Sequence, residues 1–215
     1  MKQGFRRTDK FSNSNSNNNN NSSNNNNSSN NRNNNVKTAD LTTIALFTAL
    51  MAVCSWISIP AAVPFTLQTL GVFISCGLLG GKRGTIAVVV YILLGAIGLP
   101  VFSGFTGGIG HLLGPTGGYI IGFVFSALLM WMIESAAGRS TRILTLSMIA
   151  GLLVCYAFGT AWFMIVYTRS TGEVGLLTAL GWCVFPYIIP DAIKILIAAM
   201  LCRRLRPQLA AVAQA

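Results

Sequence analysis

The sequence predicts an all-α, polytopic membrane protein with six transmembrane helices and both termini in the cytoplasm. Three observations support this prediction. Of 215 residues, 53% are hydrophobic and only 9% are charged, whereas soluble domains carry about 25% charged residues. The hydrophobic residues form long runs rather than an amphipathic pattern, so a single soluble core does not explain them. The basic residues gather in one set of loops, as the positive-inside rule describes.

The N-terminal segment 1–39 is predicted to be a disordered cytoplasmic tail. From Asn13 to Asn35 it is nearly all asparagine and serine. Such a segment has no apolar face to bury and cannot offset the entropy of ordering. No apolar core follows its basic residues closely enough to form a cleavable signal peptide. The membrane domain is therefore predicted over 40–206, with a short cytoplasmic tail at 207–215.

Six apolar runs define the predicted spans, and each break between two of them contains glycine or proline. They are Leu41–Ile59, Thr66–Leu79, Gly84–Leu99, Gly117–Ala137, Ile143–Thr168 and Leu176–Cys202. The second and third are short for a hydrocarbon core about 30 Å thick, which is more typical of transporters than of simple anchors. Pro186 and Pro190 interrupt the sixth run, so we expect a helix that begins near one of them after an irregular lead-in.

The fifteen lysine and arginine residues orient these spans. Thirteen lie in the tail, in the loops that join spans two to three and four to five, or after span six. Arg169 falls in a loop of the opposite side, and Lys194 lies within the sixth run. The positive-inside rule therefore places both termini in the cytoplasm. Because topology explains the formal net charge of +10, no nucleic-acid partner is inferred.

Motifs typical of enzymes and cofactor sites are incomplete. Gly77–Arg83 resembles a phosphate-binding loop, but Cys76 stands at the first glycine position and Arg83 where Ser or Thr would bind magnesium. Gly108-Ile-Gly110 lacks the third glycine of a dinucleotide fingerprint. One histidine and five scattered cysteines offer few ligands for a metal. We therefore predict no enzymatic activity, no catalytic residue, no cofactor and no metal site.

Asp191 and Lys194 are the most informative polar residues. Their three-residue spacing places them on one helical face. Lys194 precedes Arg203 by nine residues, or roughly 13 Å along a helix, so it is expected well inside the membrane. Buried intramembrane charges usually face a cavity or a partner, and broken helices commonly line substrate sites. The alternative is a structural pair that neutralises itself.

The predicted outer loops also carry candidate binding residues. Pro100–Tyr119 contains seven glycines in twenty residues, which let a backbone approach a ligand and expose its N–H donors. Its apolar side chains favour a folded cap or pocket wall over a flexible loop. Thr116 is a candidate N-cap for the fourth helix. Gln68, in the second span, is either a contact between helices or a ligand contact.

Ala45 and Ala49 form a ridge of small residues on the first span. Small residues four positions apart let another helix approach closely. The ridge packs either within the chain or against a separate subunit, and the residues alone do not choose between these.

Four ordered motifs resemble one family. They are Val63–Leu70, Leu94–Phe102 with the pair Gly107-Gly108 after it, Leu113–Gly122, and Pro190-Asp191-x-x-Lys194. Together they are similar to the BioY family, the biotin-specific substrate-binding (S) components of energy-coupling-factor (ECF) transporters. The resemblance extends over about 40–206, which is nearly the whole membrane domain, and leaves out the Asn-rich tail.

The resemblance implies an S-component fold of six helices in the cytoplasmic membrane, which captures biotin from the outer face. Transport then requires an ECF coupling transmembrane subunit and two ATPase subunits. It also implies that the first helix docks on the coupling subunit through Ala45 and Ala49. The alternatives are an S component for another small vitamin-like molecule, or a structural membrane protein that transports nothing.

Biotin has a ureido ring with two N–H donors and a carbonyl, an apolar thioether ring, and a carboxylate tail. Asp191 is able to accept from a ureido N–H, and Lys194 to donate to the carbonyl or the carboxylate. The other predicted contacts are polar groups and enclosing aromatic rings, namely Gln68, Gly107, Gly108, Phe65, Tyr91, Phe102 and Tyr119.

Overall fold

The structure is a computed structural model, and it describes residues 38–60, 64–172 and 175–212. The chain divides into two units, Met1–Thr42 and Thr43–Ala215. In the first unit, only 38–42 is described; it is helical, and the Thr42 hydroxyl donates to the carbonyl of Thr38 (3.0 Å). The predicted tail up to residue 37 lies outside the described residues. The fold that follows is that of the second unit.

Helices dominate the described residues, as predicted. Four segments are long and apolar enough to cross a membrane. They are the first helix Thr38–Trp56, α5 (Gly117–Ala137), α6 (Thr141–Thr171), and a last segment over Leu176–Gln208 that contains α7 (Leu176–Cys183), the 3-10 turn η2 (Phe185–Tyr187) and most of α8 (Ile188–Val212).

Two shorter helices occupy the second and third predicted runs, α2 (Gln68–Leu79) and α3 (Gly81–Ala96). A two-stranded antiparallel ribbon, β1 (Ser58–Ile59) and β2 (Phe65–Thr66), precedes them. Between α3 and α5 the chain forms the 3-10 turn η1 (Ser103–Phe105) and the short helix α4 (Ile109–Leu113). The described part therefore has more helices than the six predicted membrane spans, because the short α4 and α7 are separate elements.

The sixth predicted run breaks at one proline and not at the other. Val184 has non-helical dihedrals (φ −125°, ψ −56°), and Pro186 is the second residue of η2, where its missing N–H leaves no helical bond unmade. Pro190 lies in the first turn of α8, which begins at Ile188. An N–H in the first turn has no helical acceptor, so Pro190 does not interrupt the helix. Only Pro186 belongs to the break.

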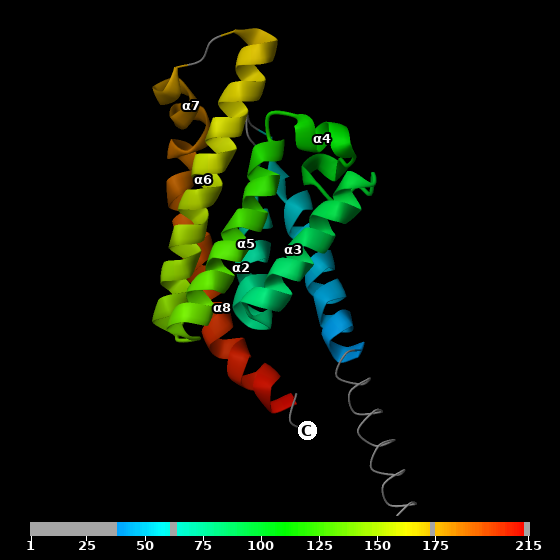
Figure 1. Cartoon of the computed structure of the whole chain (residues 1–215), viewed down its shortest axis with the longest axis vertical. Coiled ribbons are helices and arrows are strands. Elements are labelled where there is room, and N and C mark those ends of the chain that lie inside the picture. Colours follow the sequence, from blue (N-terminus) through cyan, green and yellow to red (C-terminus); the bar gives the residue numbers. More distant parts are fainter. Residues whose placement is uncertain (1–37, 61–63, 173–174, 213–215) are drawn as a thin grey trace, which may run out of the picture. The chain divides into compact units, whose positions relative to one another are not determined.

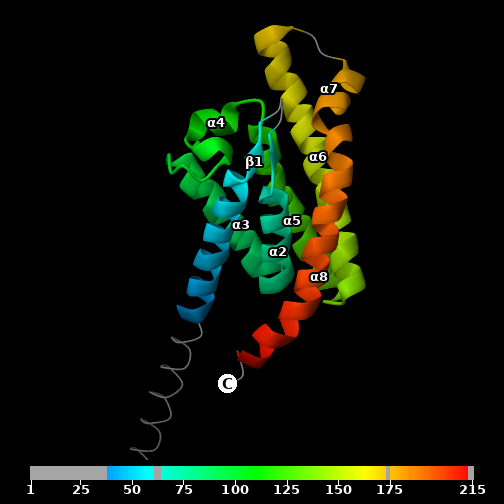
Figure 2. The ribbon, with the colours of Figure 1, turned by 180° about the vertical axis from the view of Figure 1, so that it is seen from behind.

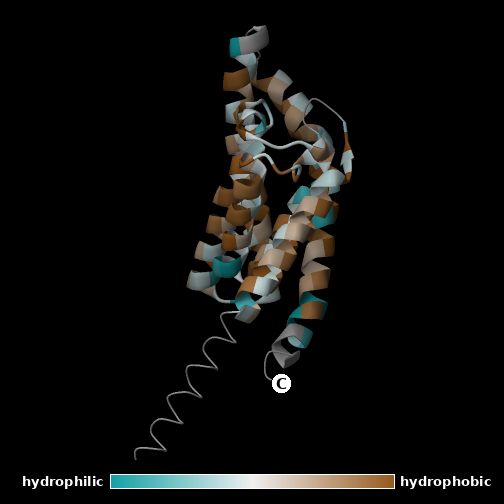
Figure 3. Cartoon of the chain, turned by 90° about the vertical axis from the view of Figure 1, so that its right-hand side faces the viewer, coloured by the Kyte–Doolittle hydropathy of each residue, from teal (hydrophilic) through white to brown (hydrophobic). Residues whose placement is uncertain are grey.

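In this unit, α5 packs against α6 and α3, and α2 packs against α8 and α3. The α2–α3 contact is close because Gly84 faces the backbone of Cys76: a Cβ at Gly84 would lie 2.5 Å from the Cys76 Cα. Figures 1 and 2 show α4 and α7 at one end of the bundle, and the α2–α3 and α5–α6 turns at the other. Figure 3 shows hydrophobic residues along the length of the helices.

A polar network ties the chain together at the end that holds these two turns. The Glu134 carboxylate, near the end of α5, accepts from the Gly81 N–H and pairs with Arg139. Arg206 of α8 donates to the carbonyls of Gly77 (2.8 Å) and Arg139 (2.9 Å). The ends of α2, α5 and α8 and the start of α3 therefore meet at this end.

Candidate ligand-binding site

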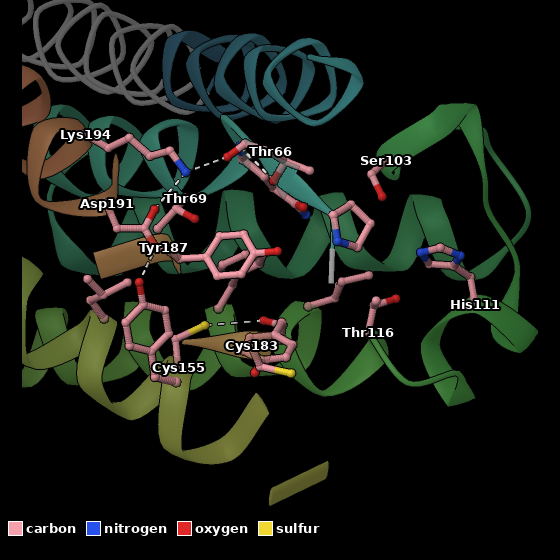
Figure 4. Close-up of a pocket in the computed structure, with 17 residues that line it drawn as sticks. Thr66, Thr69, Ser103, His111, Thr116, Cys155, Cys183, Tyr187, Asp191 and Lys194 are labelled. Carbon is pink, nitrogen blue, oxygen red and sulfur yellow. Dashed lines mark hydrogen bonds and ion pairs between the residues drawn. The ribbon is translucent and has the colours of Figure 1, made fainter. Parts of the chain in front are cut away.

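A pocket opens at the other half of the bundle, between α2, α5, α6, α8 and the segment that joins α3 to α5. The space between its walls amounts to about 620 Å³, open solvent at its mouth included. Its walls combine apolar side chains such as Ile120, Phe123 and Leu152 with polar groups at both ends. Figure 4 shows Lys194 and Asp191 at one end of the lining, and Ser103 and His111 at the other. We call these the charged end and the loop end.

At the charged end, every group is already bonded. Lys194 Nζ donates to Asp191 Oδ1 (2.7 Å) and to the Thr66 carbonyl (2.6 Å), and lies 4.1 Å from the centre of the Phe65 ring. The second carboxylate oxygen of Asp191 accepts from the Tyr156 hydroxyl. Asp191 and Lys194 are 3% and 4% exposed. Burying an ion pair is tolerated when hydrogen bonds complete it, and here they do.

The start of α8 explains how the sequence places this pair. Asp191 lies in the first helical turn, where the positive end of the helix dipole favours a carboxylate. Lys194 follows three residues later, on the same face. Because α8 begins only after η2, both side chains lie inside the bundle and not at its rim.

Gln68 lines the pocket and is held by a chain of hydrogen bonds behind it. Its Nε2 donates to the Tyr91 hydroxyl (2.8 Å), which donates to the Val101 carbonyl (2.8 Å). Tyr91 is fully buried and is not among the lining residues. The second N–H and the carbonyl oxygen of the Gln68 amide stay available for the pocket.

The loop end is built from packed aromatic rings and from hydrogen bonds of the Thr106 hydroxyl. Phe102 is fully buried, with its ring edge-on to Tyr91 and stacked on His111 (5.4 Å, 21°). His111 Nδ1 lies 3.2 Å from the Thr106 hydroxyl, which donates to the Ser103 carbonyl (2.9 Å). His111 is half-buried, and burial lowers the pKa of its imidazole below the ordinary value.

The two predicted loop glycines shape the loop behind the pocket. The Gly108 N–H donates to the Gly95 carbonyl (2.7 Å), so this predicted donor is already used inside the protein. Gly108 also has φ +95°, a conformation that L side chains rarely adopt. A Cβ on Gly107 would collide with the Leu99 carbonyl. Neither glycine is among the lining residues.

The predicted site residues therefore occupy three kinds of position. Gln68, Tyr119, Asp191 and Lys194 line the pocket. Phe65 packs beneath the Lys194 ammonium and stacks on Tyr187, and Tyr91 and Phe102 support the wall from behind. Thr116 precedes α5 as predicted, but its side chain makes no capping hydrogen bond. Ala45 and Ala49 are exposed on the first helix, away from the lining set.

The residues that sequence reasoning missed are mostly hydroxyl, thiol and imidazole groups: Thr69, Ser103, His111, Cys155, Tyr156, Cys183 and Tyr187. Tyr156 is the most important of them because it bonds Asp191. A tyrosine in an apolar run is also typical of a membrane interface, so its hydroxyl was a weak signal. Cys155 and Cys183 are buried and also line the pocket.

Comparison with known proteins gives consistent matches. A family model described as the BioY family matches residues 26–211. The biotin transporter BioY of Thermotoga maritima is 41% identical over 162 residues, which cover 75% of this chain and 92% of that protein. The probable biotin transporter BioY of Pyrococcus horikoshii is 38% identical over 172 residues, with 80% and 98% covered. A crystal structure of the S-component for biotin from an ECF-type ABC transporter superposes with a TM-score of 0.72 at 31% identity, covering 80% of this chain and 93% of that one.

Proposed function

This chain belongs to the BioY family, and we propose that it takes up biotin across the cytoplasmic membrane as the substrate-binding component of an ECF-type transporter. The relatives that match over most of their length are biotin transporters, and the matched crystal structure is an S component for biotin. The protein itself binds and does not catalyse; ATP hydrolysis belongs to partner subunits.

The observation that carries the proposal is the neutral charged end of the pocket, where Asp191 and Lys194 are held in place by hydrogen bonds. Asp191 and Lys194 cancel each other's charge and hold each other in place. Each Asp191 oxygen keeps a lone pair, and Lys194 keeps one N–H. A ureido ring presents two N–H donors and one carbonyl, with no net charge. It therefore matches these groups without adding charge to a buried site, and each charge-assisted bond contributes roughly 1.5–3 kcal/mol.

The proposed topology has six membrane segments, which are the first helix, α2, α3, α5, α6, and α7 with α8 as one. With 12 residues, α2 is about 18 Å long, so it crosses only where the protein thins the barrier. Support for cytoplasmic termini comes from the basic residues around the polar network, namely Lys82, Arg83, Arg139, Arg142, Arg203, Arg204 and Arg206. They lie in or next to the segments that this network joins, and none of them lines the pocket.

The proposed partners are a coupling transmembrane subunit and two ATPase subunits. Ala45 and Ala49 are exposed on the first helix beside the exposed Leu46 and Val53. A surface of small side chains allows a partner helix to pack closely. This is where we expect the coupling subunit to dock.

The direct test is a titration of the full-length, detergent-purified protein with biotin, and separately with thiamine and riboflavin as controls. We expect tight binding of biotin and none of the other two. Tight binding of thiamine or riboflavin in place of biotin would assign the protein another substrate. Absence of tight binding for all three would overturn the proposed function.

A further inference from the structure

The charges of the pocket leave one part of biotin without a partner. Lys194 and Asp191 are the charged residues among the described lining, and they neutralise each other. The carboxylate tail of biotin carries one negative charge at neutral pH, since carboxyl groups of this kind titrate at roughly pH 4–5. A buried anion needs an opposite charge nearby. The charged end has no surplus charge to offer.

The charged end also repels a second carboxylate. A ligand carboxylate placed on Lys194 would lie close to Asp191, whose own negative charge disfavours a like neighbour. Two of the three Lys194 N–H groups are committed to Asp191 and Thr66. The neutral ureido ring suits this end better, so the tail points toward the loop end.

At the loop end, the hydrogen bonds determine which imidazole nitrogen is free. The Thr106 hydroxyl has a single hydrogen, which it donates to the Ser103 carbonyl. It is therefore able only to accept from His111, so Nδ1 of His111 carries the proton of the neutral ring. Nε2 then presents a lone pair, which repels a carboxylate. Protonation of Nε2 turns it into a charged donor.

We propose that His111 binds the carboxylate tail of the substrate and takes up one proton at Nε2 as the substrate enters. The inference rests on the proposed function, because it concerns the same pocket and the same ligand. The proton comes from solvent and bonds to Nε2, and the resulting imidazolium neutralises the carboxylate. Ser103 and Thr116, which line the same end, provide hydroxyl donors to the tail. His111 thereby selects substrates that end in an acid.

No charged side chain of the helices packed against α4 fixes the protonation state of His111 among the described residues, so a bound carboxylate is able to change it. The helices packed against α4 are α3 and α5. The titratable groups they bring to this end are Tyr91, behind Phe102, and Tyr119 on the pocket wall, and both are neutral near pH 7. The pair Asp191–Lys194 faces the ring from α8, at the far end of the lining. Burial keeps the empty-state pKa of His111 low, and an adjacent carboxylate raises it.

The sign of the pH dependence follows from these two states. With a low pKa in the empty protein and a higher one in the complex, the complex binds more protons. Affinity for biotin therefore rises as pH falls from the higher pKa to the lower, by up to about tenfold per pH unit. Above both values the affinity is constant.

The experiment is calorimetric titration of the full-length protein with biotin at one pH near 7.5, in phosphate and in Tris, whose ionisation enthalpies differ. The dependence of the binding heat on buffer gives the number of protons taken up. We expect uptake of up to one proton for biotin and none for biotinamide, which lacks the carboxylate. Equal heats of biotin binding in the two buffers would mean that no proton is taken up, and would overturn the inference.

Two variants identify the residue. His111→Gln is expected to weaken biotin binding by about tenfold or more, to abolish proton uptake, and to weaken biotinamide binding much less than biotin binding. His111→Lys carries a fixed charge and is expected to restore affinity for biotin without proton uptake. Retained biotinamide binding shows that each variant is folded. If wild-type protein binds biotin and His111→Gln matches it in affinity and proton uptake, the inference fails and the proposed function stands; if wild type binds neither ligand, the proposed function fails.

Discussion

Both oxygens of the Asp191 carboxylate are engaged before any ligand arrives, one by Lys194 and one by Tyr156. At this scale the site is an example of preorganisation: three side chains from α6 and α8 fix each other's positions by hydrogen bonds. Such an arrangement binds a polar ring without first reorganising its own groups. It also makes each member sensitive to substitution, because a buried charge left without its partner is costly.

Asp191→Asn is expected to abolish biotin binding and to leave Lys194 as an unpaired buried charge. Removal of one partner of a buried pair destabilises by about 3–5 kcal/mol, so the melting temperature in detergent should fall. The double variant Asp191→Asn with Lys194→Met contains no buried charge and should recover stability without recovering binding. Size-exclusion chromatography after heating measures the first property, and biotin titration the second. If Asp191→Asn binds biotin normally, the pair is structural only.

Tyr156→Phe is expected to weaken biotin binding by roughly tenfold while the protein stays folded, because only one hydroxyl is lost. Since Tyr156 acts through Asp191, the two substitutions should not be additive. In an Asp191 variant that still binds biotin, for example Asp191→Glu, the added Tyr156→Phe substitution should weaken binding much less than it does in the wild-type protein. Fully additive losses would mean that Tyr156 contacts the ligand independently of Asp191.

Among elements, the close approach of α2 and α3 positions Gln68 over the pocket while Tyr91 bonds it from behind. Gly84 makes this approach possible, since any side chain there meets the Cys76 backbone and not a flexible side-chain tip. The wall of the pocket thus depends on a contact that lies away from the ligand.

Gly84→Ala should force the two helices apart and destabilise by about 1–3 kcal/mol, the usual effect of overpacking. Gly181→Ala in α7 is the matched control, because a Cβ there has no neighbour within 4 Å; it should be neutral or slightly stabilising. Thermal unfolding of both variants in the same detergent makes the comparison. Equal melting temperatures would show that the helices repack without strain.

The sequence predicted some of these elements and residues better than others. Gln68, Asp191 and Lys194 could be found because polar side chains stand out in apolar runs, and all three line the pocket. The start of α8 could not be fixed, because proline is tolerated both in a break and in a first helical turn. The folded α4 was hidden in a glycine-rich segment whose helix depends on tertiary contacts. The sequence showed His111 only as a single histidine. Its place in the pocket and its hydrogen bond with Thr106 depend on the folded loop.

At the scale of the whole molecule, the residues that line the pocket include none of the basic residues of the polar network, and Ala45 and Ala49 are exposed on the first helix and do not line the pocket. Binding and partner docking thus use different surfaces. Substitutions on one should leave the other intact.

The double variant Ala45→Trp with Ala49→Trp should bind biotin with unchanged affinity and fail to co-purify with the coupling subunit and the ATPases. Bulky rings prevent the close helix contact that small residues allow. Leu153→Trp, on the exposed face of α6 (61% exposed), adds a ring elsewhere and should leave the complex intact. If the variant with Ala45→Trp and Ala49→Trp still co-purifies with the partner subunits, this docking surface is ruled out.

The bond from Lys194 to the Thr66 carbonyl has a mechanical consequence. Thr66 belongs to the ribbon that leads into α2, whereas Lys194 belongs to α8, so a single hydrogen bond joins the ribbon to α8. A displacement of the ribbon away from α8 would break this bond and free a second N–H of Lys194 for a ligand. The position of the ribbon and the number of donors that Lys194 offers to the pocket are therefore coupled through one hydrogen bond.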